Sequence, residues 1–329
     1  MEAWLPRCLD SLLTKELLEE LEIWVVNDGS NDKSSDIAHQ YETKHPGIYN
    51  VIDKPNGNYG SCINAALPKC TGKYVKILDA DDYFITGNLT AMVSKMREVD
   101  VDLFLSDVQS FGTTERTDNV PRTNSGEVLP ITGFKAKYLA MHQIAYRTEL
   151  LKNIGYRQTE GISYTDTEWD YFPMFHVQDF YYMNKVVYMY FEGRAGQTMA
   201  PDVIARNTSQ FETIMKRMIG FYSSFDKSHL KPEVLNYLDF RNWAIASHVY
   251  GGYALLNPSK ENFKKLWAID DELKKTNYTL YNKIGENHFS FFGIRYKYMN
   301  FIRKQNYGVL LALVKTNNIA RSVAKRFSK

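Results

Sequence analysis

Lys73-Tyr-Val-Lys-Ile-Leu78 runs directly into Asp79-Ala-Asp-Asp82, and this stretch decides the fold class. Its first part has the pattern of a short buried strand, and its second part places three carboxylates within four residues. Like charges repel, so such a cluster at the end of a strand suits either a bound cation or a specialised turn. The stretch therefore predicts a strand that delivers an acidic cluster to one edge of a sheet.

The chain before this stretch alternates between expected helices and strands. We expect helices over residues 3–20, 34–44 and 59–70, and strands over residues 22–26 and 49–53. The turn-forming segment Asn27-Asp-Gly-Ser-Asn-Asp32 follows the first of these strands. Alternation at this spacing predicts a parallel, doubly wound α/β sheet, in which ligands bind beyond the carboxyl ends of the strands. Both Asp-rich segments are expected at that edge.

The rest of the chain predicts a mixed region followed by a helical one. Between residues 83 and 200 we expect helices over 89–99, 148–153 and 167–176, and strands over 102–105, 144–147 and 186–190. Farther on, we expect helices over 211–221, 234–256 and 260–274, and then a basic tail. We therefore predict an α/β domain over residues 1–200 and a helical C-terminal region over residues 201–329.

Bulk composition narrows the class of protein. The 329 residues carry a net charge of +2, which gives no reason to expect nucleic acid as a partner. Three cysteines without metal-ligand spacing favour a reducing cytoplasm over a secreted disulfide framework. The first residues do not form a signal peptide, and the longest strongly apolar run, Val309 to Val314, is too short to span a bilayer. We expect a cytoplasmic protein.

The acidic segments suggest two kinds of ligand contact. Asp79, Asp81 and Asp82 carry the oxygen ligands that Mg²⁺ and Mn²⁺ prefer, so the cluster suits a metal ion bound to a diphosphate. The alternative is an Asp-rich turn that caps the next helix. Asp28 can accept a hydrogen bond from a base N–H while Gly29 lets a ligand approach the backbone, and the alternative there is a simple turn and N-cap. Both alternatives stay open on these residues alone.

Five segments of the chain, taken in order, are similar to those of the family 2 inverting glycosyltransferases. They are Trp24-Val-Val-Asn-Asp-Gly-Ser-Asn-Asp32, Asn56-Gly-Asn-Tyr-Gly-Ser-Cys-Ile-Asn64, Gly72-Lys-Tyr-Val-Lys-Ile-Leu-Asp-Ala-Asp-Asp82, Gly161-Ile-Ser-Tyr-Thr-Asp-Thr-Glu-Trp169 and Tyr190-Phe-Glu-Gly-Arg-Ala-Gly-Gln-Thr198. The resemblance implies a GT-A-type fold with a doubly wound, mostly parallel sheet, and a nucleotide-sugar donor, in particular a UDP-sugar.

The resemblance also implies residues that bind the donor. Asp28 is expected to contact the uracil, with Gly29 and Ser30 beside it, and Asn64 is expected near the nucleotide. The metal ion, Mg²⁺ or Mn²⁺, and the donor sugar are expected at three carboxylates, which are Asp79, Asp81 and Asp82.

The same family pattern points to a catalytic residue. Asp166 matches the position of the general base, although Thr165 stands where relatives commonly carry glutamate, and Glu168 is a nearby fallback. The alternative for Asp166 is a helix N-cap. Arg194, in a loop with flanking glycines, is expected to clamp the diphosphate or the acceptor, and a surface salt bridge is an equally good account of it.

The start of the chain departs from the family pattern. Relatives begin with an apolar strand and a turn, whereas Met1 falls immediately before the helix that follows them. The absent strand is central in the family's sheet, between the strands expected at 22–26 and 73–78. Deleting one strand separates its neighbours by roughly 10 Å and leaves backbone groups unpaired on both. We therefore expect a longer product that begins roughly 15 to 20 residues earlier.

These inferences define one function and two alternatives. The function is transfer of a sugar, with inversion, to a saccharide or lipid-linked saccharide acceptor during assembly of a cell-surface polysaccharide or glycan. A nucleotidyltransferase could use a similar sheet and metal site. A truncated, non-catalytic binding or scaffold protein is the other alternative.

The basic tail suggests a membrane surface. Apolar residues (Ile319, Val323, Phe327) recur at helical spacing, and basic residues (Arg321, Lys325, Lys329) lie on another face. Such a helix can lie on the anionic inner face of the cell membrane. The alternative is a helix docked on the protein with a solvated basic face.

Overall fold

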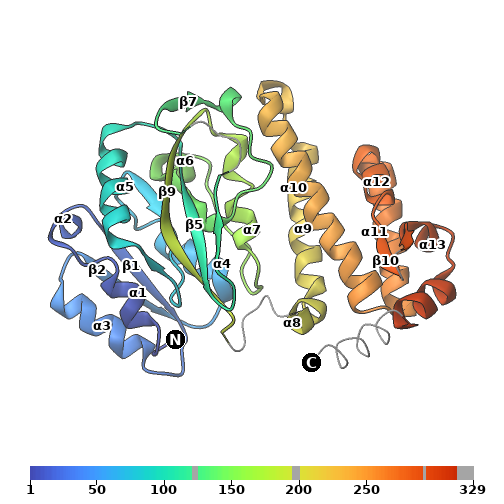
Figure 1. Ribbon diagram of the computed structural model, residues 1–329, viewed down its shortest axis with the longest axis horizontal. Coiled ribbons are helices and arrows are strands. Elements are labelled where there is room, and N and C mark those ends of the chain that lie inside the picture. Colours follow the sequence, from blue (N-terminus) through green and yellow to red (C-terminus); the bar gives the residue numbers. More distant parts are fainter. Residues whose placement is uncertain (121–124, 195–200, 292–293, 317–329) are drawn as a thin grey trace. The chain divides into compact units, whose positions relative to one another are not determined.

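A computed structural model describes residues 1–120, 125–194, 201–291 and 294–316 of the chain (Figure 1). The chain divides into two compact units. The first comprises Met1–Gln197 with Ser228–Leu238, and the second comprises Thr198–Lys227 with Asp239–Lys329. All the carboxylates singled out above belong to the first unit.

The first unit opens with two short helices where one long helix is predicted. Helix α1 covers Leu5–Asp10 and α2 covers Lys15–Leu18. Thr14 separates them because its backbone is extended and its side-chain oxygen accepts a hydrogen bond from the Leu17 N–H, 3.2 Å away. This is an N-cap, which starts a new helix. Both helices bury leucines, Leu5 and Leu9 in α1 and Leu17 in α2.

A parallel strand–helix–strand unit follows, as predicted. Strand β1 (Ile23–Asp28) pairs with β2 (Tyr49–Lys54), and Ile23 lies opposite Tyr49. Helix α3 (Ser34–Lys44) connects the two strands, and α4 (Asn58–Ala66) follows β2. Among the described strands, β1 and β2 form a sheet of their own.

The second sheet of this unit is mixed, so the prediction of a mostly parallel sheet is wrong for it. Its main order is β3-β8-β5-β9-β4, with β6 beside β5 and β7 beside β9. Strands β5 and β9 are parallel, whereas β3–β8, β5–β8 and β4–β9 are antiparallel. The bounds are β3 Tyr74–Lys76, β4 Tyr83–Phe84, β5 Leu103–Gly112, β6 Arg116–Asp118, β7 Val128–Pro130, β8 Ile144–Arg147 and β9 Asp179–Glu192.

Short helices complete the first unit and position its loops. Helix α5 (Thr86–Glu98) follows β4, and α6 (Thr148–Asn153) has the bounds predicted from the sequence. The expected helix over 167–176 is divided into α7 (Asp166–Trp169) and the 3₁₀ turn η3 (Pro173–Phe175). Two further 3₁₀ turns, η1 (Ile131–Gly133) and η2 (Met141–Gln143), precede β8.

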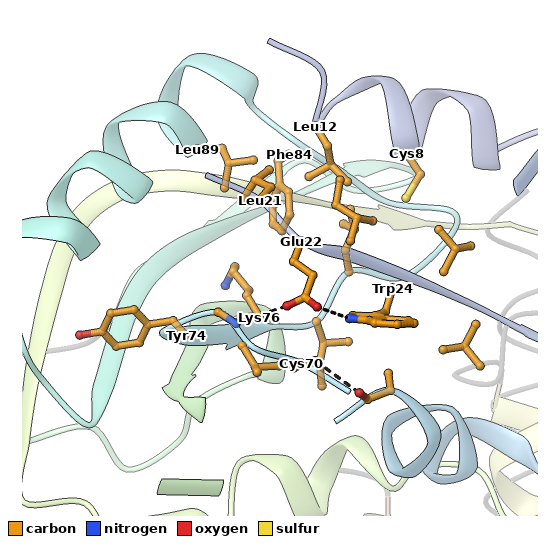
Figure 2. Close-up of a pocket in the computed structure, with 18 of the residues that line it drawn as sticks. Cys8, Leu12, Leu21, Glu22, Trp24, Cys70, Tyr74, Lys76, Phe84 and Leu89 are labelled. Atoms are coloured by element: carbon orange, nitrogen blue, oxygen red, sulfur yellow. Dashed lines mark hydrogen bonds between the residues drawn. The ribbon is translucent and has the colours of Figure 1, made fainter. Parts of the chain in front are cut away.

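A cleft of about 620 Å³ lies between β1 and β3. Its lining includes the β1 residues Ile23 to Val26 and the segment from Tyr74 to Leu78, together with side chains of α1, α4 and α5. Figure 2 shows Cys8, Leu12 and Leu89 on one side of the cleft and Cys70 on the other, with Trp24 and Lys76 between them. Protein interiors rarely hold voids larger than a water molecule, so a cleft of this size is an unusual feature of a core.

The second unit is predominantly helical, in agreement with the predicted C-terminal region. Its main helices are α9 (Thr208–Ser224), α11 (Lys260–Thr276) and the part of α10 (Pro232–Gly251) from Asp239 onward, and a π-helical turn, η5 (Gly252–Leu256), follows α10. The smaller elements are α8 (Pro201–Arg206), α12 (Tyr278–Gly285), α13 (Met299–Arg303) and the antiparallel pair β10 (Phe289–Phe291) and β11 (Ile294–Tyr296). The 3₁₀ turn η4 (Lys227–His229) lies where the chain passes from the second unit into the first.

The second unit also contains a buried ion pair. Asp270 of α11 accepts two hydrogen bonds from the Arg303 guanidinium, at 2.8 and 3.0 Å. None of the helices in the described residues has the length and apolar character that a membrane span requires. The predicted membrane-binding tail, with Ile319, Val323 and Phe327, lies outside the described residues.

Candidate functional site

The acidic segment after β3 forms a tight turn that brings two carboxylates to a histidine. The Asp82 N–H donates to the Asp79 carbonyl at 3.0 Å, which closes the turn. Asp79, Asp82 and His142 each place one potential ligand atom within 4.8 Å of the others. His142 comes from η2, some sixty residues later in the chain. Two carboxylates and an imidazole at this spacing form a candidate cation site.

Asp82 is the most deeply buried carboxylate of the cluster. Its side chain is 1% exposed and accepts hydrogen bonds from the Tyr188 hydroxyl at 2.6 Å and the Phe191 N–H at 2.7 Å. Burial, and then the nearby charge of Asp79, raise the pKa of Asp82 to about 7 despite these bonds. The carboxylate pair therefore carries an electrostatic strain that a bound cation would relieve.

His142 is a site residue that sequence reasoning misses. Its ring packs against the rings of Tyr188 and Tyr190, with centroids 4.7 Å away in both cases, and its Nε2 lies 3.8 Å from Asp79 Oδ2. Lys76 of β3 donates to the His142 carbonyl at 2.7 Å and so ties η2 to the strand that leads into the acidic turn. The seven histidines show no ligand spacing in the sequence, so only the pairing of β3 with β8 reveals this one.

Asp81 faces two arginines rather than the other two carboxylates. Its Oδ2 accepts a hydrogen bond from Arg194 Nε at 2.7 Å, and its backbone carbonyl accepts one from Arg7 at 2.8 Å. The Arg7 guanidinium lies over the rings of Tyr83 and Phe111, 4.7 and 4.9 Å from their centroids. Such cation–π contacts hold the charge in place. Thus the predicted metal set is divided: Asp79 and Asp82 approach His142, whereas Asp81 is engaged by Arg194.

Asp28, at the end of β1, is neutralised by the protein itself. Its Oδ1 accepts hydrogen bonds from Lys54 Nζ at 2.5 Å, the Gly57 N–H at 2.9 Å and the Ser61 hydroxyl at 3.4 Å. All three donors reach one oxygen, so within the described residues Oδ2 is the oxygen available to accept from a base N–H. Gly29 follows with a φ of +71°, a conformation that favours glycine.

Ser30 and Asn64 have structural partners. The Ser30 N–H donates to the Asn27 side chain at 3.0 Å, which is the turn that the alternative interpretation expects. Asn64 is 9% exposed, and its amide group donates to the Gln158 carbonyl at 2.9 Å and accepts from the Gln158 N–H at 2.9 Å. Asn64 therefore fastens α4 to the segment around residue 158, and its proposed place near the nucleotide follows from the family pattern alone.

Close backbone contact joins the loop before α4 to the segment before α7. The Gly161 N–H donates to the Gly57 carbonyl at 2.8 Å. A Cβ placed on Gly60 would lie only 2.1 Å from the Thr159 carbonyl oxygen, so any other residue there would force the two segments apart. Since Gly57 also donates to Asp28, this contact connects the end of β1 to the segment that carries Asp166.

Asp166 is the first residue of α7, and Thr165 takes the N-cap position instead. Tyr164, just before it, has a φ of +67°, which is uncommon for a residue with a side chain and typical of functional segments. Burial, and then the charges of Asp79 and Asp166, raise the pKa of Tyr59 well above its ordinary value. Tyr59 therefore lies near both carboxylates.

Glu168 does not act as an open fallback for Asp166. It is fully buried, and its two carboxylate oxygens accept from the backbone N–H and the hydroxyl of Thr159, both at 2.7 Å. Its role is to hold the segment before α7.

The fold and the site together define an α/β protein with a cation-type acidic cluster beyond the carboxyl end of a strand. Residues 2–155 match the model of glycosyl transferase family 2, and this part of the chain belongs to that family.

Curated relatives match over part of their length. The chain is 38% identical over 85 residues to an uncharacterized glycosyltransferase of Mycoplasma pneumoniae, covering 25% of this chain and 28% of the relative. It is 32% identical over 116 residues to the glycosyltransferase GlyA of Streptococcus pneumoniae, covering 35% and 16%. It is 29% identical over 129 residues to the uncharacterized glycosyltransferase EpsJ of Bacillus subtilis, covering 39% and 37%. Each match therefore spans less than two fifths of the relative.

A solved structure shares the fold over most of the chain. Residues 1–349 of Staphylococcus aureus TarS, in complex with UDP-GlcNAc, superpose with a TM-score of 0.52 at 17% sequence identity. The superposition covers 89% of this chain and 92% of that one. This likeness shows a GT-A fold.

Proposed function

We propose that the chain is an inverting, metal-assisted glycosyltransferase. It moves a sugar from a nucleotide-diphosphate donor, a UDP-sugar, to a hydroxyl group of a saccharide or lipid-linked saccharide in cell-surface polysaccharide assembly. Membership of family 2 supports the reaction class, and the UDP-GlcNAc bound to TarS supports the donor class. The observation that carries the proposal is the meeting of Asp79, Asp82 and His142 within 4.8 Å.

The residues present fit a divalent cation. Asp82 is buried and has a raised pKa, because its burial and the charge of Asp79 disfavour the ionised form, and a divalent cation would supply compensating positive charge. Asp79 and His142 supply two more ligand atoms, and Asp81 stays in the proposed set through Oδ1, since its bond to Arg194 uses Oδ2. A bound Mg²⁺ or Mn²⁺ would neutralise the charge that grows on the departing diphosphate.

The other residues position the donor and the acceptor. Asp28 accepts an N–H of the base through Oδ2 while Lys54 compensates its charge. Arg194 orients Asp81 through its bond to Oδ2, and its positive charge beside the cluster is suited to a diphosphate. Asp166 accepts the proton of the acceptor hydroxyl as that oxygen attacks the anomeric carbon from the face opposite the diphosphate, so the configuration inverts.

The variant Asp166→Asn tests the proposal. We expect its turnover to fall by about 10²- to 10⁴-fold, the usual contribution of a general base, while its affinity for the donor changes by less than about threefold. UDP release from a panel of UDP-sugars measures turnover, and calorimetry with UDP measures binding. Asp36→Asn, which changes an exposed carboxylate in the first turn of α3, is the matched control and should match the unmodified protein.

Two outcomes would contradict this function. Normal turnover in Asp166→Asn removes the general base from the proposal. Release of diphosphate from a nucleoside triphosphate, in place of UDP release from a UDP-sugar, identifies a nucleotidyltransferase instead.

A further inference from the structure

The two units of the chain carry opposite charges. The second unit holds 20 Lys and Arg residues against 9 Asp and Glu, a formal charge of +11, whereas the first holds 20 against 29, a formal charge of −9. The two charges nearly cancel, so the net charge of the chain is only +2. Such an asymmetry between two parts of a chain indicates that the basic part meets a polyanion or an anionic surface.

Helix α11 presents part of this positive charge to solvent along one side. Residues spaced alternately four and three apart share a side of a helix, and on α11 they are Lys260, Lys264, Trp267, Asp271 and Lys274. We call these five residues the α11 stripe. Its three lysines and its tryptophan are all exposed.

Trp267 is exposed although α11 has a buried face for apolar side chains. On that face Phe263 and Leu266 are fully buried, whereas Trp267 is 42% exposed. The described residues include seven exposed large hydrophobic side chains, and five of them belong to the second unit: Leu256, Trp267, Tyr278, Ile294 and Val309. The second unit therefore combines its positive charge with exposed apolar side chains.

The charge of the α11 stripe is not compensated by the carboxylates around it. Asp271, its one acidic member, pairs with Lys275 at 2.6 Å. The three lysines of the stripe form no ion pair with any other described residue. The stripe thus keeps three positive charges that are available to an anionic partner.

Helix α12 adds two tyrosines beside the end of the α11 stripe. It follows α11 in the chain and packs against it (Figure 1). Lys274 Nζ lies 5.9 Å from the centroid of the Tyr281 ring, and Tyr278 stacks on that ring with centroids 5.8 Å apart. Tyr278 is 61% exposed. Tryptophan and tyrosine favour the boundary between water and lipid, and lysines beside them attract anionic headgroups.

We propose that the α11 stripe, together with Tyr278, is a docking surface for an anionic membrane. Trp267 and Tyr278 enter the headgroup region, and Lys260, Lys264 and Lys274 bind the phosphate groups of the lipids. A soluble polyanion would satisfy the lysines but leave the two rings in water, so the exposed rings favour a bilayer. This surface is separate from the basic tail, and it does not rest on the proposed transferase activity.

Vesicle sedimentation with the full-length protein tests this proposal. We expect binding to vesicles that contain phosphatidylglycerol and none to vesicles of phosphatidylcholine alone. The triple variant Lys260→Gln, Lys264→Gln and Lys274→Gln should lower the partition coefficient about 100-fold, because each basic residue near an anionic surface contributes about 1 kcal/mol.

A second triple variant is the matched control. Lys135→Gln, Lys137→Gln and Lys185→Gln remove the same charge from exposed positions of the first unit and should bind as the unmodified protein does. All six lysines are exposed, so thermal unfolding without vesicles should be unchanged in both variants.

Quenching by lipids brominated in the acyl chain separates insertion of the rings from simple adsorption. We expect such lipids, mixed with phosphatidylglycerol, to quench the tryptophan fluorescence of the unmodified protein. Trp267→Phe should lose most of that quenching, whereas Trp24→Phe, which changes a tryptophan of the first unit, should keep it.

Three results would overturn the proposal. They are equal binding to neutral vesicles, an unchanged partition coefficient in the α11 triple variant, and quenching that survives Trp267→Phe. Binding to heparin or polyglutamate, with none to phosphatidylglycerol vesicles, would identify a soluble polyanion as the partner instead. No readout involves a sugar donor or turnover, so failure here is distinguishable from failure of the proposed function.

Discussion

The ends of β1 and β3 both present carboxylates, but the protein treats their charges in opposite ways. At the end of β1, Lys54 lies 2.5 Å from Asp28, and two more donors reach the same oxygen. At the end of β3, Asp82 accepts from two neutral donors, the Tyr188 hydroxyl and the Phe191 N–H. It is buried and lies beside the charge of Asp79, and its pKa rises to about 7. A compensated carboxylate is suited to accept a hydrogen bond from a neutral base. The Asp79–Asp82 pair, in which the two charges repel each other, is suited to bind a cation.

The largest effect is expected when Asp79 loses its charge, because this removes the difference in charge between the ends of β1 and β3. We expect Asp79→Asn to lower kcat/KM by about 10²- to 10³-fold in the presence of Mn²⁺, because the cation loses a ligand. We also expect the cation-free variant to be at least as stable as the unmodified protein, since a repulsive charge beside Asp82 is gone. Initial rates and thermal unfolding, each with and without Mn²⁺, measure the two effects.

Asp118→Asn is the control for this variant. The Asp118 carboxylate pairs with the Arg116 guanidinium and is not one of the three side chains that meet at the cluster, so the change should leave rates nearly unaltered. A variant at Asp79 that binds Mn²⁺ normally would show that the cluster is not the cation site.

The pH dependence of the free energy of unfolding tests whether the charge of Asp82 at the end of β3 is uncompensated. In the folded protein Asp82 keeps its proton up to a pKa of about 7, whereas in the unfolded chain it loses it near 3.8. The folded state therefore binds more protons between these values, and cation-free protein should lose stability as the pH rises from about 4 to about 7. The difference between a pKa of 3.8 and one of about 7 corresponds to at most about 4 kcal/mol.

Urea unfolding across this pH range, with and without Mn²⁺, measures the slope. The cation should flatten it, because it stabilises the ionised form. Asp82→Asn should remove the contribution of this group even without cation, and an unchanged slope in that variant would assign the pH dependence to other residues.

The smallest effect is expected at the end of β1, where Lys54 compensates the charge of Asp28. Lys54→Met leaves Asp28 half-buried without its cation, and we expect donor affinity to fall about tenfold, roughly 1.4 kcal/mol, with kcat nearly unchanged. Lys95→Met, which breaks an exposed pair with Glu98, should change neither quantity. Steady-state kinetics with a UDP-sugar separate KM from kcat, and a loss confined to kcat would contradict a binding role for the Lys54–Asp28 pair.

Sequence patterns predict those helices and strands whose bounds depend on neighbouring residues in the chain. Strand β8 and helix α6 have the predicted bounds, because an apolar run ends where a helix-forming segment begins. The acidic turn after β3 is predicted for the same reason. The helix expected over 3–20 is wrong because a single Thr14 cap competes successfully with an apolar face that spans the break.

Long-range pairing is what the sequence does not reveal. Strand β3 pairs antiparallel with β8, seventy residues away, and β9 extends over fourteen residues although only five were expected. His142 reaches the cluster through that pairing, and Arg7 reaches the Asp81 carbonyl from the first helix. Neither residue has a local signature, since its partners are fixed only when the sheet forms.

The contact of Gly60 with Thr159 has a kinetic consequence. Hydrogen bonds connect Asp28 to Gly57 and Gly57 to Gly161, and Gly60 lies close to Thr159 in the segment that leads to Asp166. If the nucleotide binds at Asp28 as proposed, these contacts connect it to the segment that carries the proposed general base. We expect a compulsory order of addition, with the nucleotide sugar first and the acceptor second.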